Sequence, residues 1–387
     1  MKSKSLLLLL LLPILFGVIS LAAVNLVVDP HGRILLVNKA GFNRDKLTIK
    51  PQSRKAKASV LRECELDSVV LGSTRAEATV NPKSAVFSGQ RVYNAALKGS
   101  SMLEAEKTGL YMLGFQTPDV VLLDLGFYMF NEARGGAHDF YESPLAGGQS
   151  LVSVFSYLLS LQTLRQSYFT IKQNRAGMSM CKQTGHGIGF PVRGAPLERI
   201  ATRINKYAET PDLYGDYLAG EAHYESLGNL LGQLTSAGIR VHVYISPVHA
   251  LQLESIRRLG LMDDYESWKR RVVQVTEEVN EGLPDELRMT LWDFSGYNSV
   301  SMEAVPLSDA GQMRWFRDST ANTAEVGEMI VDFLLSGARK QRPDDFGVAL
   351  SSANIDSYIE RQRKIGANYA LANAALIESA LASLSKN

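Results

Sequence analysis

The chain is poor in the residues from which several kinds of functional site are built. It has only two cysteines in 387 residues, Cys64 and Cys181, which excludes a framework of many disulfides and a zinc site made of thiolates. The sequence leaves open whether these two pair. The formal net charge is +1, so no overall electric field points to nucleic acid as a partner. No dinucleotide fingerprint, P-loop or cluster with metal-ligand spacing occurs. The sequence therefore indicates no metal and no other cofactor.

Long apolar runs are also scarce, apart from one at the amino terminus. Lys2 and Lys4 precede an apolar run over residues 6–28, which is about as long as the roughly 20 residues of a membrane-spanning helix. Positive charge ahead of the run keeps the amino terminus in the cytoplasm. Residues 1–28 are therefore expected to be a single-pass anchor in the cell inner membrane. The alternative is a signal peptide cleaved among the small residues 20–23. Both interpretations place the remainder on the periplasmic or extracytoplasmic side.

Beyond the anchor, the pattern predicts an α/β domain. Residues 29–66 are polar and basic and are interpreted as a juxtamembrane segment. From residue 67 onward, strand-like runs alternate with helical patterns, which favours a parallel sheet covered by helices. The run over residues 120–125 is almost entirely apolar, as is typical of a central parallel strand. The clearest further strands are expected at residues 69–71, 240–246 and 289–294.

The fold expected from this pattern is a three-layer α/β/α sandwich with a mainly parallel, flavodoxin-like sheet over residues 67–335. Residues 132–213 contain no clear strand pattern and are interpreted as a helical insertion, a candidate cap over the site. Residues 251–279 are expected to be helical. Residues 336–387 are polar and rich in alanine, which predicts a helical carboxyl-terminal extension.

One short stretch carries the first chemical signal. The apolar run at residues 69–71 is broken by Gly72 and followed by Ser73, Thr74 and Arg75. Open α/β sheets build their sites at the carboxyl ends of buried strands, where a tight turn presents polar groups. Glycine permits such a turn because it lacks a Cβ atom. An ordinary strand-to-helix turn has the same pattern, so this stretch does not specify a function by itself.

Four blocks of the chain together resemble those of the SGNH hydrolases. They are Gly-Ser-Thr-Arg at residues 72–75, the segment from Asn94 to Gly99, the strand closing in Gly126, and Asp318-x-x-Ala321 before a Glu-Val-Gly helix. The resemblance spans residues 67 to about 335. Within that family, the chain most resembles the membrane-anchored, exported branch that includes alginate O-acetylation proteins and the D-alanine transfer protein of teichoic acids. In that family a Gly-x-Ser turn supplies the nucleophile, and Asp-x-x-His completes the triad, with the His taking the serine proton.

The resemblance places the catalytic positions on residues that depart from the family pattern. The nucleophile position falls on Thr74, with Ser73 at the variable middle position. Threonine has a usable hydroxyl, but its methyl group restricts χ1 and crowds the attack. The Asp position falls on Asp318, whereas the His position falls on Ala321. Alanine cannot accept a proton, so the implied triad is degenerate.

The substrate-binding positions are better preserved. The family lines its oxyanion hole with a glycine and an asparagine, and the resemblance assigns the turn and the oxyanion hole to Gly72 and Gly99. The asparagine that the family carries in its third block has no clear counterpart here. The matching block is the strand closing in Gly126, and Asn131 lies a few residues too far along the chain from it. Asn94 and Asn131 are nevertheless candidates for this part of the site. Arg75 has the chemistry to pair with a ligand carboxylate or phosphate, and an ordinary salt bridge is its alternative role.

Two functions remain open at this point. The first is a non-catalytic or weakly active SGNH-like protein of cell-envelope or exopolysaccharide modification, which the missing His favours. The second is an active O-acyltransferase or esterase on an exported glycan, with Thr74 or Ser73 as nucleophile and His249 as a non-standard base. His249 follows a predicted strand at the functional edge, although a structural loop histidine has the same pattern. The expected partners are the membrane and an exported polysaccharide or an acyl-donor membrane protein.

Overall fold

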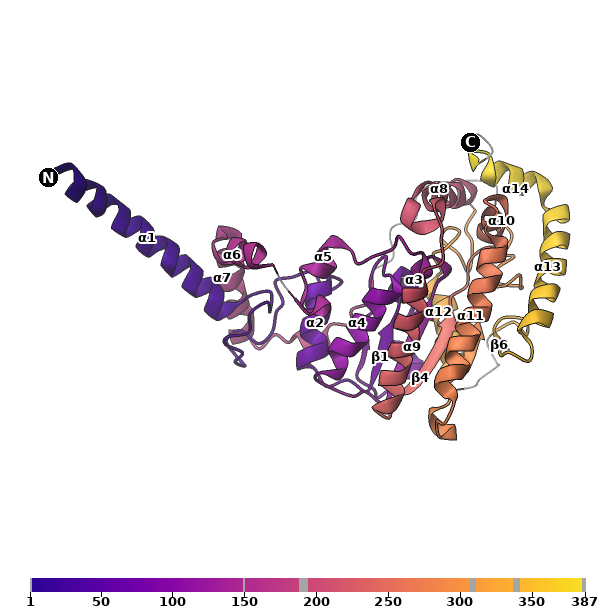
Figure 1. Cartoon of the computed structure of the whole chain (residues 1–387), viewed down its shortest axis with the longest axis horizontal. Helices are drawn as coiled ribbons and strands as arrows, with labels where there is room; N and C mark the ends of the chain where they lie inside the picture. The colour runs from indigo at the N-terminus through magenta and orange to yellow at the C-terminus, as the bar shows by residue number, and fades with distance from the viewer. Residues whose placement is uncertain (1, 149, 188–193, 307–310, 337–341, 385–387) are drawn as a thin grey trace. The chain divides into compact units, whose positions relative to one another are not determined.

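The computed structural model describes residues 2–148, 150–187, 194–306, 311–336 and 342–384, and the chain divides into two compact units. Unit 1 comprises residues 1–64 and 137–183, and unit 2 comprises residues 65–136 and 184–387 (Figure 1). Most of the segment interpreted as juxtamembrane therefore folds together with part of the expected insertion.

Unit 1 is helical. Its helices are α1 (Lys2–Val28), α2 (Arg54–Glu63), α5 (His138–Tyr141), α6 (Leu151–Leu158) and α7 (Leu161–Arg175), with the short turns η3 (Pro144–Ala146) and η4 (Met180–Lys182). By length and composition, Leu11–Val28 of α1 is apolar enough to cross a membrane. A disulfide between Cys64 and Cys181 joins the two chain segments of this unit, with 5.5 Å between the Cα atoms. The pairing that the sequence left open is thus made within unit 1.

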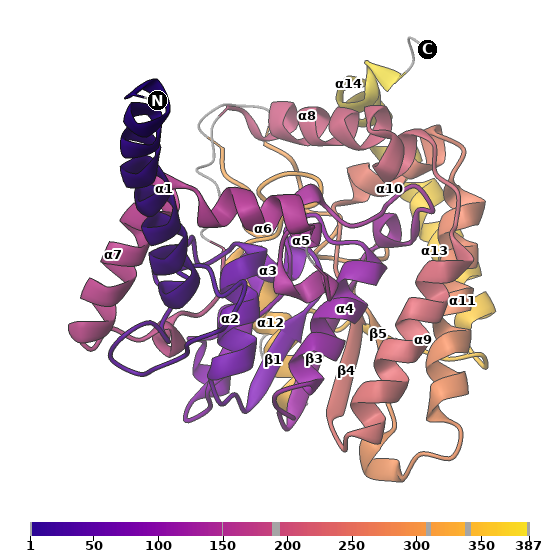
Figure 2. The ribbon, with the colours of Figure 1, turned by 60° about the vertical axis from the view of Figure 1, so that its left-hand side comes forward.

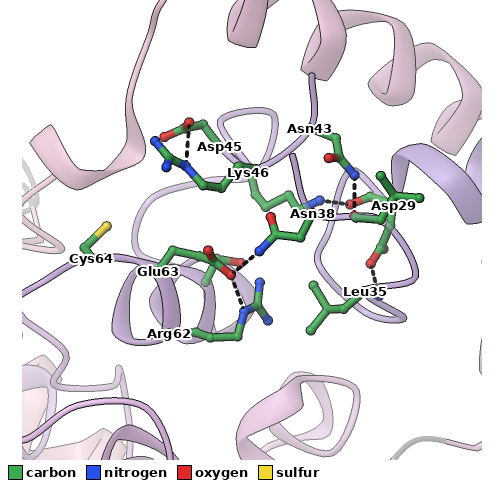
Figure 3. Close-up of polar contacts among 12 residues, drawn as sticks. Asp29, Leu35, Asn38, Asn43, Asp45, Lys46, Arg62, Glu63 and Cys64 are labelled. Carbon is green, nitrogen blue, oxygen red and sulfur yellow. Dashed lines mark hydrogen bonds and ion pairs between the residues drawn. The ribbon is translucent and has the colours of Figure 1, made fainter. Parts of the chain in front are cut away.

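The end of α1 is built into unit 1 by buried polar groups (Figure 3). Asp29 follows the helix in a left-handed conformation, with φ of 44°, which is a common way to terminate a helix. Its carboxylate accepts hydrogen bonds from the backbone N–H groups of Arg33, Ile34 and Leu35. The buried ammonium of Lys46 donates to the carbonyl oxygens of Val28 and Asp29. These bonds satisfy carbonyl groups at the helix end that have no partner within the helix.

Unit 2 contains the predicted α/β architecture. Its strands are β1 (Ser68–Leu71), β2 (Val92–Asn94), β3 (Val120–Leu125), β4 (Arg240–Ile245), β5 (Leu291–Asp293) and β6 (Val348–Leu350). They form one sheet in the order β2-β1-β3-β4-β5-β6. The first five are parallel, and β6 is antiparallel to β5. In this order the direction of winding reverses between β1 and β3, where open α/β sheets bind ligands.

Helices cover both faces of the sheet, which confirms the expected three-layer fold. The helices of unit 2 are α3 (Thr74–Thr79), α4 (Met102–Leu113), α8 (Pro196–Glu209), α9 (Glu221–Ser236), α10 (Ala250–Arg258), α11 (Met262–Asn280), α12 (Ala324–Ser336), α13 (Ile355–Ala372) and α14 (Ala374–Leu381). Short helical turns are η1 (Ala85–Phe87), η2 (Phe127–Phe130), η5 (Pro211–Gly215) and η6 (Asp285–Leu287). Helix α9 packs between α4 and α11, and α12 packs against α3 (Figure 2). The interior is made of the apolar strands, of which β1 and β3 are wholly buried.

Two sequence expectations are corrected in unit 2. The helix expected over residues 251–279 is two helices, α10 and α11, which are separated near Gly260. The carboxyl-terminal extension is not wholly helical, because β6 adds a strand to the sheet. Three residues are too few to display the alternation by which a strand is found in a sequence.

Candidate functional site

The turn after β1 is shaped by close contact with β3. Gly72 has φ of +130°, and a Cβ atom there would lie 2.6 Å from the Cβ atom of Asp124, so only glycine fits. The Ser73 hydroxyl donates a hydrogen bond of 2.7 Å to the Asp124 carboxylate, and the Ser246 hydroxyl donates to the other carboxylate oxygen. All of these side chains are buried. The Ser73 hydroxyl is therefore turned toward the sheet and is not presented to a substrate.

Thr74 and Gly99, which are expected to share one site, are in contact. The backbone N–H of Gly99 donates a hydrogen bond of 2.7 Å to the Thr74 hydroxyl oxygen. The Gly99 carbonyl oxygen accepts a hydrogen bond from Arg134, whose guanidinium is also paired with Asp212. Because Thr74 accepts this bond, its own hydroxyl hydrogen remains available as a donor among the described residues. Thr74 is half-buried, so this hydroxyl can be reached.

Asp318 and Ala321 lie together on the loop between Phe316 and Asn322, which form an isolated bridge. One Asp318 oxygen accepts hydrogen bonds of 2.8 Å from the N–H groups of Thr320 and Ala321. The other accepts a hydrogen bond of 2.8 Å from the Nε atom of Arg203 on α8, and the Nη2 atom of the same guanidinium lies 2.8 Å from it. The carboxylate thus forms an ion pair with Arg203. Within the described part of the chain, no hydrogen bond joins Asp318 or Ala321 to Thr74.

The two candidate asparagines are bound to backbone groups. The Asn94 amide donates to the carbonyl oxygens of Ala76 and Val80, and its oxygen accepts from the Ala96 N–H. The Asn131 amide donates to the carbonyl oxygens of Pro211 and Leu213. Both side chains are completely buried. They hold turns in place, and their donors are already used.

His249 is also occupied. It is completely buried at the start of α10, where its Nδ1 atom accepts a hydrogen bond from the Leu251 N–H. Its Nε2 atom lies 2.9 Å from the Glu303 carbonyl oxygen and serves as the donor in the neutral ring. Burial lowers the pKa of His249 to about 4. Both ring nitrogens are bonded within the protein, so neither is free to take a proton from a nucleophile.

We expect this histidine to make unit 2 sensitive to acid. Its folded-state pKa lies below the ordinary value, so the unfolded chain binds the proton more readily. Its stabilising contribution is complete above about pH 6.5 and declines as the pH falls toward 4, by about 3 kcal/mol in all. A His249→Asn variant keeps a side chain that can cap α10 but does not titrate. In urea unfolding of the full chain at several pH values, the acid decline should be smaller in the variant. Equal declines would contradict the assignment.

Arg75 is the least satisfied charge at this edge of the sheet. The residue is only 5% exposed, and its Nε and Nη2 atoms are buried without a hydrogen-bond partner in the part of the chain that the structure describes. Its guanidinium lies 5.6 Å from the centre of the Tyr128 ring. Burial by itself lowers the pKa of Arg75. Its polar neighbours outweigh burial, so the pKa is raised. These neighbours are Tyr207, Tyr214, Tyr128 and Asp124. A buried guanidinium without an acceptor is costly unless a ligand supplies one.

Arg75 has two further arginines as neighbours, and each of these is already paired. Arg134 lies 4.9 Å from the centre of the same Tyr128 ring and is paired with Asp212. Arg203 is paired with Asp318, and this carboxylate outweighs both burial and the nearby charge of Arg75, so the pKa of Arg203 is raised. Arg134 and Arg203 each have a carboxylate partner, whereas Arg75 forms no ion pair among the described residues, although the Asp124 carboxylate is close enough to raise its pKa.

The sequence identified Arg75 and Asp318 but missed Arg134, Arg203 and Tyr128. Arg134 and Arg203 lie in the region interpreted as an insertion, where no motif distinguishes one arginine from another. No three or more His, Cys, Asp or Glu side chains of the described residues gather as a metal site. No family model and no curated protein matches this chain.

Proposed function

We propose that this chain is a membrane-anchored, exported SGNH-like protein that binds an anionic group of an exported glycan and does not carry out acyl transfer. The observation that carries this proposal is the Arg75 guanidinium, whose Nε and Nη2 atoms are buried at the carboxyl edge of the sheet without a hydrogen-bond acceptor among the described residues. Proteins rarely leave a buried charge in this state, and such a group is retained where a ligand completes its bonding.

The surrounding residues lack the parts of an acyl-transfer site. Serine-type transfer needs a hydroxyl nucleophile and an adjacent base oriented by a third group. The Ser73 hydroxyl is bonded to Asp124, and Ala321 offers no base. Asp318, which would orient that base, is held by Arg203. These contacts favour binding over catalysis.

The chemistry of the ligand follows from the groups that face it. A guanidinium presents a planar fork of donors, which matches the oxygens of a carboxylate or a phosphate. The Thr74 hydroxyl, one residue earlier, retains its hydrogen as a second donor. Acidic glycans carry such groups on uronate or phosphorylated sugars. We therefore propose an acidic glycan as the ligand class, with a neutral glycan excluded.

Two observations support export. The basic residues Lys2 and Lys4 lie in the first turn of α1, ahead of its apolar run, which is the arrangement of an anchor that leaves the following domain outside the cytoplasm. The disulfide between Cys64 and Cys181 is of the kind that forms in oxidising compartments.

The proposal is tested by thermal unfolding of the detergent-solubilised full chain with added ligand. A polyuronate oligosaccharide at about one hundred times its Kd should stabilise the protein by about 2.7 kcal/mol. For a domain of this size that corresponds to a rise of about 5 to 10 °C in Tm. An Arg75→Gln variant should lose the rise, because its side chain offers no charged fork to the anion.

The matched control is Arg91→Gln, an exposed arginine paired with Asp67 and Glu65 just before β2. It should keep the full rise. A neutral glucan oligosaccharide should have no effect, and inorganic phosphate as a second probe distinguishes a phosphate ligand from a carboxylate. An unchanged rise in Arg75→Gln, or equal stabilisation by the neutral oligosaccharide, would refute the anion site.

A second function has one observation in its favour. The contact between the Thr74 hydroxyl and the Gly99 N–H keeps the nucleophile position beside the oxyanion donor. A weak acyltransferase or esterase that uses Thr74 is therefore the alternative. It differs from the first proposal in requiring turnover of an acyl ester.

A further inference from the structure

Helix α7 buries a polar face, unlike an ordinary surface helix. Its buried side chains are polar and lie three or four residues apart, namely Thr163, Ser167, Thr170 and Asn174. That spacing places them on one face of the helix. Its exposed side chains include the apolar or aromatic Leu161, Tyr168 and Phe169, which lie beside the polar Gln162, Arg165, Lys172 and Arg175. An ordinary surface helix buries apolar side chains instead.

Helix α6 exposes still more apolar surface. Leu151 and Val152 are each 75% exposed and Phe155 is 62% exposed. Its single buried side chain is Tyr157, whose hydroxyl donates to the Asp29 carboxylate. We call the exposed apolar and aromatic side chains of this region the apolar hairpin surface: Leu151, Val152, Phe155, Leu159, Leu161, Tyr168 and Phe169. Exposed apolar surface of this extent marks a site of interaction.

The apolar hairpin surface lies at the end of the apolar helix α1. Both α6 and α7 pack against α1, and α6 runs across its axis (Figure 2). Asn25 near the end of α1 donates to the carbonyl oxygens of Leu158 and Ser160, where α6 passes into α7. The Ser167 hydroxyl donates to the Asn25 oxygen. If α1 spans a membrane, these contacts place α6 and α7 at the membrane surface.

The charge of the hairpin identifies the occupant of this surface. Residues 151–175 contain no aspartate or glutamate, whereas Arg165, Lys172 and Arg175 are exposed on α7. Anionic phospholipid headgroups attract such residues, while the neighbouring apolar side chains fit the acyl region. This combination favours a lipid surface over a protein surface.

We infer that α6 and α7 lie in the boundary layer between headgroups and acyl chains of the bilayer that α1 spans, on the side of the folded domain. The apolar hairpin surface is inserted about 5–10 Å into this layer, as for other interfacial helices. Unit 1 is thereby fixed in orientation to the membrane plane. The inference rests on the proposed anchoring by α1 and is independent of the anion site.

The experiment measures the environment of a nitroxide attached at Phe155→Cys in the full chain. The chain is reconstituted into vesicles of phosphatidylethanolamine and phosphatidylglycerol, and Cys64 and Cys181 remain joined to each other. The matched control is Leu371→Cys on α13, which is 82% exposed in unit 2. Relative to the control, the label at 155 should lose collisions with a water-soluble nickel chelate and gain collisions with oxygen. Leu161→Cys repeats the measurement on α7.

Three outcomes would overturn the inference. Equal access of the nickel chelate to positions 155 and 371, in a chain that resists extraction by an alkaline wash, would place the hairpin in water. An immobilised label that neither reagent reaches would indicate that a second copy of the chain covers the surface. A soluble chain beginning near Val24 would show that α1 does not anchor the protein. The last result is a failure of the anchoring and is distinguishable from the first two.

Discussion

An Ala321→His, Thr74→Ser double variant is expected to hydrolyse p-nitrophenyl acetate about 10²–10⁴ times faster than the unmodified chain, which should act barely above background. The imidazole supplies the general base that the chain lacks, and serine removes the methyl group that crowds the nucleophile. The backbone N–H of Ala321 lies 2.8 Å from an Asp318 oxygen, so a side chain at this position starts beside the carboxylate that would orient it.

The controls for this variant follow from the neighbouring contacts. A further Arg203→Met change frees the second Asp318 oxygen, which is now paired with that arginine, and should not lower the gained activity. A further Ser73→Ala change should preserve the gain, because Ser73 is bonded to Asp124 and is not the nucleophile. No gain in a folded double variant would contradict the proposed relation to the SGNH hydrolases. Strong activity in the unmodified chain, abolished by His249→Ala, would instead establish a working enzyme.

Replacing Lys269 by Met should destabilise unit 2 by about 3–5 kcal/mol, because it leaves a buried carboxylate without its cation. The Lys269 ammonium lies 2.5 Å from an Asp293 oxygen, and the two side chains are 3% and 0% exposed. Burial lowers the pKa of Lys269, but the Asp293 carboxylate outweighs it, and the pKa is raised. Burial raises the pKa of Asp293, but Lys269 and Ser295 outweigh it, and the pKa is lowered.

Urea unfolding followed by tryptophan fluorescence measures this loss, since Trp268 and Trp292 adjoin the two charged residues in sequence. Adding Asp293→Asn to the Lys269→Met variant should recover part of the stability, because no unpaired charge remains. Arg258→Met is the matched control. Its partner Glu378 is exposed, and an exposed pair contributes at most about 1 kcal/mol. Similar losses in Lys269→Met and the control would refute the buried-pair explanation.

The parts of the fold that were predictable are those in which burial leaves a local pattern. β3 is buried along its whole length, so five of its six residues are apolar and only Asp124 interrupts the run. β6 has only three residues and pairs with β5 from a distant part of the chain. The division between α10 and α11 leaves the helical spacing of apolar residues almost uninterrupted. Short elements and helix breaks of this kind depend on tertiary contacts.

The candidate site was predictable where one turn defines it. The glycine break after an apolar strand identified Gly72, Ser73 and Thr74, and the resemblance added Gly99, which lies against Thr74. The hydrogen-bond or ion-pair partner of each polar group was not predictable. The Ser73 hydroxyl is bonded to a carboxylate 51 residues later, and Asp318 is paired with an arginine 115 residues earlier. Such partners are chosen by the packing of strands and helices and leave no local signal.

The amino-acid sequence by itself determined the apolar amino-terminal helix, the alternation of strands and helices, and the glycine turn that ends β1. Each of these depends on residues close together in the chain. Only the tertiary structure decided that Arg75 Nε and Nη2 have no acceptor among the described residues and that the face of α7 with Thr163, Ser167, Thr170 and Asn174 is its buried face. A helical period reveals two faces but not which of them is covered. That choice is made by the elements packed against the helix, here α1 with the buried amide of Asn25.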